Sequence, residues 1–122
     1  MRQIENYSIN ILERTKNFGV KIIRVSSKLP KNPAGFSIAD QLVRAATSIG
    51  ANLIEAQEAV SRSDFLYKIS FSLKEAKETR YWLELTGMSK FLTANEIQPL
   101  LQENDEIVKI LITISKKLKS KK

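Results

Sequence analysis

Five polar side chains between residues 41 and 55 are the best candidates for chemistry in this chain. They are Gln41, Arg44, Ser48, Asn52 and Glu55. On an α-helix their spacing places them in one sector about 80° wide. Two carboxylates further along the chain, Glu75 and Glu78, are three residues apart, so a helix would present both on one side. If the two segments face each other, Arg44 can pair with either glutamate in a hydrogen-bonded network.

The same residues could in principle form an active site, but the composition argues against it. The chain has no histidine and no cysteine, which excludes a histidine base, a cysteine nucleophile, zinc–thiolate sites and haem ligation by either residue. Two glutamates three residues apart resemble half of a di-iron site, but such sites need Glu-x-x-His motifs. A magnesium site made of carboxylates alone is left open. We therefore predict a structural network with no catalytic residue, no cofactor and no metal.

The sequence predicts four helices to position these side chains. The expected helices cover residues 5–28, 36–59, 63–86 and 95–119. Apolar residues recur at three- and four-residue intervals, as on the buried face of a helix, and no segment alternates with the period of a strand. Short connections favour antiparallel neighbours. We predict an all-α protein, an antiparallel up-down-up-down four-helix bundle, forming one domain over residues 1–122.

Proline, glycine and hydroxyl residues mark the expected ends of these helices. Pro33 is interpreted as a loop residue, so the second helix is expected to begin after it, with Ser37 as its N-cap. Gly87 is the expected C-terminal residue of the third helix. Thr93 begins a capping-box pattern, but Pro99 lies too deep for that cap, so regular helix is expected to begin a few residues later.

The second predicted helix carries too little charge for a helix that faces water. Between residues 41 and 55 its charged residues are Arg44 and Glu55. One of its sectors consists of small or apolar residues: Ala39, Val43, Ala46, Gly50 and Ile54. A surface helix of a simple bundle normally has a broad charged face. We therefore predict that a second copy of the chain covers this sector; the alternative is that the small residues allow close packing within one subunit.

The net charge of +7 is concentrated near the C-terminus, where five lysines lie in the last seven residues. These are Lys116, Lys117, Lys119, Lys121 and Lys122. Without them, 15 basic residues face 13 acidic ones. A second basic group is expected near one end of the bundle: Lys21, Arg24, Lys28 and Lys31. Both groups are candidate phosphate contacts, although lysines also suit the negative end of a helix dipole. Most aromatic residues fall at core spacing, so base stacking is not expected and any binding should be non-specific.

Two segments of the chain resemble a known family. Residues 40–55 (DQLVRAATSIGANLIE) resemble the QLxRAAxSIxANIxE stretch of the 23S rRNA intervening-sequence proteins, also called the S23 family, and residues 74–85 (KEAKETRYWLEL) resemble its EAxETxYWLxL stretch. The resemblance covers about residues 5–118 and departs at Ala56, where many members have glycine. It implies a bacterial, cytoplasmic four-helix bundle, and family structures look like ring-shaped homopentamers. The family is similar to the accessory protein of diversity-generating retroelements, a basic pentamer that contacts nucleic acid.

Three functions remain open from the sequence. The first is a non-enzymatic homo-oligomer, pentameric by the resemblance, that binds RNA or DNA through its basic residues. The second is a scaffold or adaptor for another protein, with no role for nucleic acid. The third is an enzyme, for which no nucleophile–base pair, glycine-rich phosphate loop or metal motif is present. No apolar run approaches the ~20 residues of a membrane span, and no targeting segment is visible, so a cytoplasmic location is expected.

Overall fold

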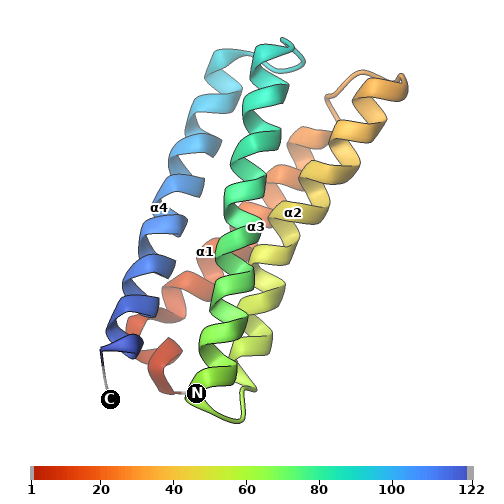
Figure 1. Ribbon diagram of the computed structural model, residues 1–122. Helices are drawn as coiled ribbons and strands as arrows, with labels where there is room; N and C mark the ends of the chain where they lie inside the picture. The colour runs from red at the N-terminus through yellow and green to blue at the C-terminus, as the bar shows by residue number, and fades with distance from the viewer. Residues whose placement is uncertain (1, 121–122) are drawn as a thin grey trace.

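Four long helices make up the part of the chain that the structure, a computed structural model, describes: residues 2–120, with side chains from Ile11 onward. They are α1 (Arg2–Ser26), α2 (Pro33–Gln57), α3 (Arg62–Met88) and α4 (Ala94–Lys119). Consecutive helices run antiparallel, and α4 returns to pack against α1 (Figure 1). Among the described residues, α1 does not contact α3 and α2 does not contact α4. The helices therefore lie at the corners of a square, which confirms the predicted antiparallel bundle and places the α1/α2 and α3/α4 pairs on opposite sides.

The core fills the centre of this square along its whole length. Its largest fully buried side chains are Phe18, Phe65, Ile11, Ile22, Leu42, Ile49, Leu53, Ile69, Leu83, Ile107 and Leu111. These residues follow the three- and four-residue spacing found in the sequence, and burying each stabilises the fold by about 1.5–3 kcal/mol relative to exposure. Ile4 and Tyr7, which the same spacing assigns to the core, lie outside the described side chains. Val60 continues the spacing of the core residues of α2, which predicts a buried position, but it is 92% exposed because α2 ends at Gln57.

The start of α2 differs from the expectation because Pro33 belongs to the helix. Asn32 is the N-cap, and its side-chain oxygen accepts a 2.9 Å hydrogen bond from the backbone N–H of Gly35. Pro33 occupies the first turn, where its fixed φ suits the helix and its missing N–H would have had no partner. The prediction that Ser37 caps this helix was therefore wrong.

The end of α3 lies beyond Gly87, the residue expected to close it. The helix continues to Met88, and the chain reverses at Lys90, which has a φ of 60°. The backbone N–H of Phe91 then reaches back to the carbonyl of Thr86 at 3.1 Å, as in a Schellman-type end. The left-handed residue at this helix end is therefore Lys90, and not the glycine that the sequence offers nearby.

The start of α4 follows the capping box in full. The Thr93 side chain accepts from the N–H of Glu96, and the Glu96 carboxylate accepts from the N–H of Thr93. Regular helix begins at Ala94, so the expected later start was wrong. Pro99 lies inside the helix and leaves the carbonyl of Asn95 without its usual donor, which costs little because Asn95 is exposed to water. No described helix is both long and apolar enough to cross a membrane.

Candidate functional site

The predicted pairing of Arg44 with the two glutamates joins α2 to α3. The Arg44 guanidinium donates to Glu78, and its Nη1 lies 3.5 Å from Glu75 Oε1. It also donates to Gln41 Oε1 at 3.1 Å. Trp82 Nε1 donates to the same Glu78 oxygen at 3.0 Å. This hydrogen bond from Trp82, together with the charge of Arg44, lowers the pKa of Glu78, so the carboxylate stays ionised.

The other polar residues of α2 do not extend this cluster across the helices. Ser48 donates to the carbonyl of Arg44 at 2.7 Å, and Asn52 donates to the carbonyl of Ser48 at 2.8 Å, both within α2. Glu55 pairs with Lys68 of α3 at 2.9 Å. In place of one continuous network, α2 and α3 are joined by two separate groups of ion pairs, one at Arg44 and one at Glu55.

A second arginine cluster, which the sequence reasoning missed, joins α1 to α4. Arg14 donates to Glu103 at 2.7 Å and to Glu106 at 2.8 Å, and the hydrogen bond from Arg14 lowers the pKa of Glu106. Glu103 and Glu106 have the same three-residue spacing as Glu75 and Glu78, and that spacing was the signal available in the sequence. In both clusters an arginine on one helix binds two glutamates on its neighbour.

These clusters join helices to each other. Each glutamate lies within ion-pair distance of an arginine of the same chain, although the buried Oε1 of Glu75 accepts no hydrogen bond. Arg44 remains partly exposed, with 47% of its side chain accessible. Within the described part of the chain, no three acidic side chains gather closely enough to hold a metal ion. The arrangement is that of interhelical ion pairs, two glutamates of one helix around an arginine of the next.

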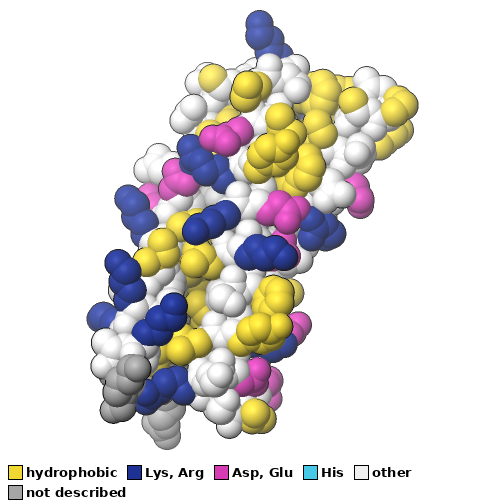
Figure 2. Space-filling view, in the orientation of Figure 1, with side chains coloured by type: hydrophobic (Ala, Val, Ile, Leu, Met, Phe, Trp, Pro, Cys, Tyr) yellow, Lys and Arg dark blue, Asp and Glu magenta, His cyan; other side chains and the backbone are white. Residues whose placement is uncertain are grey.

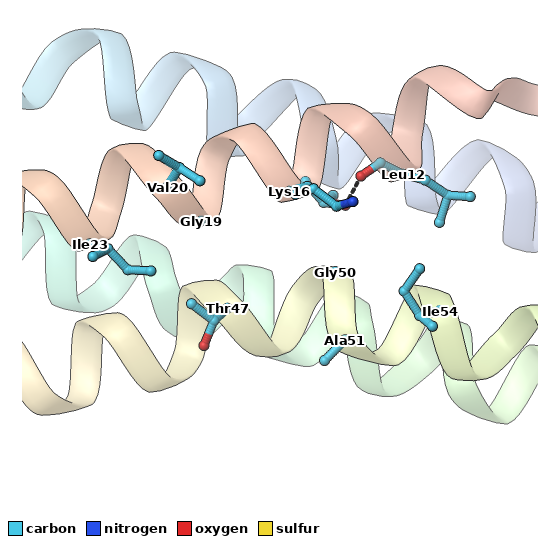
Figure 3. Close-up of a pocket in the computed structure, with 10 residues that line it drawn as sticks. Leu12, Lys16, Gly19, Val20, Ile23, Thr47, Gly50, Ala51 and Ile54 are labelled. Carbon is cyan, nitrogen blue, oxygen red and sulfur yellow. Dashed lines mark hydrogen bonds between the residues drawn. The ribbon is translucent and has the colours of Figure 1, made fainter.

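An apolar groove of about 300 Å³ runs between α1 and α2. Its floor lies at Gly19 and Gly50, where the helices approach closely: a Cβ at Gly50 would lie 3.1 Å from the hydroxyl of Thr15. Figure 3 shows the side chains on its two rims, which are Leu12, Lys16, Val20 and Ile23 from α1 and Thr47, Ala51 and Ile54 from α2. The groove thus exposes aliphatic surface with a single lysine at its edge.

The five residues predicted as an oligomer interface are divided between this groove and the interior. Ala46 is fully buried within the chain, and Ala39 and Val43 are half-buried against the core. Gly50 packs against α1, so part of the sector serves close packing within one subunit. Ile54, 51% exposed, remains available on the rim.

The two predicted basic groups lie at opposite ends of the bundle. Lys21 and Arg24 lie on α1 beside the start of α4, and Lys28 follows two residues after the end of α1 and pairs with Glu96 at 2.9 Å. Lys31 lies in the following loop and donates to the carbonyl of Ser27. The C-terminal group is at the other end of α4, about 30 Å away at 1.5 Å per residue (Figure 1). Its described members are Lys116, Lys117 and Lys119, and all are exposed; Lys121 and Lys122 lie outside the described residues.

The aromatic residues are less buried than their spacing indicated. Among the described side chains, only Phe18 and Phe65 are aromatic and buried. Phe36, Tyr67 and Tyr81 are each more than half exposed. Trp82 and Phe91 pack against the core from partly buried positions, so four of the eight described aromatic side chains contribute to the core. The argument against base stacking applies to those four and not to the exposed rings.

Known proteins are similar to this chain in sequence and in architecture. Residues 8–113 match the family described as 23S rRNA-intervening sequence protein. The chain belongs to this family. A crystal structure of a protein of unknown function from the S23 ribosomal protein family of Bacteroides thetaiotaomicron is similar, with 38% identity and a TM-score of 0.82. The similarity covers 87% of this chain and 98% of that one. No curated protein matches the chain.

The match to the 23S rRNA-intervening sequence protein family spans the residues of most of the features described above. The matched residues include both arginine clusters, the α1/α2 groove and the basic group on α1. The C-terminal lysines begin at residue 116, beyond the last matched residue. The family match therefore covers most of the bundle and does not extend to the C-terminal lysines.

Proposed function

We propose that this chain is a non-enzymatic cytoplasmic protein that self-associates and, as an oligomer, binds RNA or DNA through basic side chains. The observation that supports self-association most directly is the outward face of α2. Four exposed or half-exposed residues of this face carry no charge: Val43, Thr47, Ala51 and Ile54. The exposed charges of α2 between Asp40 and Glu58, Arg44 and Glu55, pair with α3. Together with the α1 rim of the groove, the four uncharged residues form an apolar strip of the kind that marks protein interfaces.

A single charge placed in the groove tests this part of the proposal. Ile54→Lys adds a lysine to the rim, and the half-exposed position tolerates it in the folded subunit. Val60→Lys is the matched control, because Val60 is 92% exposed and lies beyond the end of α2. We expect light scattering coupled to size-exclusion chromatography to show an oligomer for the wild type and the control, and a subunit mass for Ile54→Lys. A wild-type monomer would refute self-association, and an Ile54→Lys oligomer would refute this surface.

Nucleic-acid binding is supported by the excess of basic side chains that lack an acidic partner. Among the described residues, Lys21, Arg24, Lys109, Lys116 and Lys119 are exposed and make no ion pair within 4 Å. An oligomer repeats these charges, so weak phosphate contacts add up through avidity. The name of the family and that of its structural relative, which refer to ribosomal RNA and to a ribosomal protein family, agree with this proposal.

A salt titration of RNA and DNA binding tests this second part. We expect binding at low salt that weakens linearly on a log–log plot, with a slope of about 0.7 per phosphate contacted in a single strand. Absence of binding at low salt would refute it. An oligomer that binds no nucleic acid would favour the alternative, a scaffold that offers its surfaces to another protein.

A further inference from the structure

The outer face of α3 carries an exposed stripe of aromatic and basic side chains. Tyr67, Lys74, Tyr81 and Met88 follow each other at seven-residue intervals, and all four are exposed. Lys77 lies beside them, also exposed. Figure 2, in the orientation that puts α3 in front, shows hydrophobic side chains above and below a basic group on this helix. We propose that this stripe is a platform for single-stranded nucleic acid, on which unpaired bases stack; the inference rests on the function proposed above.

Each tyrosine of the stripe is held by a second aromatic ring. Tyr67 meets Phe71 edge-on, with ring centroids 4.8 Å apart and planes at 85°. Tyr81 meets Trp82 in the same way, at 5.0 Å and 73°. The tyrosines are 59% and 54% exposed, so each keeps free ring surface while its neighbour restricts its movement. Along the helix they are about 21 Å apart, which leaves room for several nucleotides between two stacking points.

Lys74 and Lys77, between the tyrosines, make no ion pair within 4 Å. The ammonium of Lys74 lies 5.8 Å from the centroid of the Phe71 ring, and its charge helps to lower the pKa of Glu78. The nearby carboxylates are paired with arginines. Glu78 binds Arg44, while Glu84 and Asp105 both bind Arg80, at 3.3 and 2.7 Å. The positive charge of Lys74 and Lys77 is therefore available to phosphates.

The neighbouring helix α4 extends the same charge. Its register against α3 is fixed by Asn104, which donates to the carbonyl of Ala76 at 2.9 Å. In antiparallel helices this pairing puts the exposed Lys109 level with the region between Tyr67 and Lys74. Figure 2 shows dark-blue side chains over the C-terminal half of α4 on the same face. A phosphate backbone lying beside the tyrosines thus meets basic groups from both helices.

The chemistry of the stripe favours a single strand over the other possible occupants. In a duplex the base faces are covered by their neighbours, so exposed tyrosines gain nothing, whereas stacking on aromatic rings is a main source of affinity for unpaired bases. A second copy of this chain fits poorly, because lysine is depleted at the centre of protein interfaces and two copies of the stripe would repel. The apolar groove that we propose for self-association lies on the opposite side of the square, between α1 and α2.

Tyrosine-to-alanine variants of the full chain test the inference. Fluorescence anisotropy would measure the binding of a labelled oligo-uridine strand and of an RNA duplex of the same length, at low salt. Tyr67→Ala and Tyr81→Ala should each weaken single-strand binding by about fivefold or more, the equivalent of one lost base stack, and leave duplex binding unchanged. Tyr67→Phe and Tyr81→Phe keep the ring and should bind like the wild type. Phe36→Ala removes an equally exposed aromatic side chain at the start of α2 and should also have no effect.

The outcomes separate this inference from the proposed function. If the wild type binds strands and the alanine variants bind equally well, the stripe is overturned while nucleic-acid binding stands. If the alanine variants change the oligomer mass in light scattering, the stripe is a subunit contact and the inference is wrong. If the wild type binds no strand at low salt, both proposals fail. Loss of single-strand affinity alone, with unchanged mass and unchanged duplex affinity, supports the stacking platform.

Discussion

Replacing Gly35 by alanine should unfold this protein more easily, although alanine is the better helix former. Gly35 lies in the first turn of α2 and is buried against the preceding loop. A Cβ at this position would lie 1.9 Å from the carbonyl oxygen of Pro30 and 2.8 Å from its carbonyl carbon. Both atoms are backbone, so no side-chain rotation can relieve the contact, and moving the loop disturbs the adjacent buried Leu29.

The expected size of the effect is the difference between two terms. Alanine gains at most about 1 kcal/mol over glycine inside a helix. Forcing extra volume into a packed site typically costs about 1–3 kcal/mol, and a contact with rigid backbone belongs at or above the upper end. We expect a net loss of about 2 kcal/mol in the free energy of unfolding. For a chain of this length that corresponds to a fall in Tm of about 8 °C.

Gly19→Ala is the matched control for Gly35→Ala. A Cβ at Gly19 would meet only the Thr47 methyl group, at 3.7 Å, which is ordinary van der Waals contact. We expect this variant to be more stable than the wild type by about 0.5–1 kcal/mol. Urea and thermal unfolding followed by circular dichroism, at one protein concentration, measure both variants, with light scattering to confirm equal assembly. A Gly35→Ala protein as stable as the wild type would refute the reasoning, and so would equal losses in both variants.

Two further predictions concern the ion pairs. Arg44→Met leaves Glu75, whose side chain is 14% exposed, without its charge partner. We expect urea unfolding to show a loss of about 2 kcal/mol in the free energy of unfolding. An unchanged free energy would contradict this, because it would show that water replaces the guanidinium. The pKa of Glu96 is lowered to about 2 by the backbone N–H of Thr93 and by Lys28. Its contribution to stability is therefore complete above its ordinary pKa near 4.5 and lost as the pH falls towards 2. Glu96→Gln should lower Tm at pH 7 but not at pH 2, and an equal difference at both would exclude this origin.

The helices and the first arginine cluster were predictable because periodicity and spacing act locally. Arg44 was placed opposite Glu75 and Glu78 from their positions on two amphipathic helices, and the structure brings them together. The details that were missed depend on backbone geometry. Pro33 at the first helical position and Lys90 with a positive φ are each compatible with a loop as well as with a helix end, so their residue types alone do not decide.

The exposed stripe of α3 was missed because this helix does not separate polar from apolar residues. Ser72, Thr79 and Thr86 are fully buried, and each hydroxyl donates to a backbone carbonyl, so its burial costs little. Meanwhile Tyr67 and Tyr81 face outward. When hydroxyls lie inside and aromatic rings outside, the periodicity of hydrophobic residues gives no clear orientation, and tertiary contacts decide which face is the core.

If the chain binds nucleic acid as proposed, the placement of the two basic groups at opposite ends of the bundle would govern how many strands one subunit can hold. The helices run uninterrupted between them, so the separation of about 30 Å is that of a stiff rod. A very short oligonucleotide would then contact one end at a time, and a subunit could hold two of them. A strand long enough to follow the rod would contact both ends and displace the second oligonucleotide. The number of strands bound per subunit would thus depend on strand length even if every phosphate contact were equally weak.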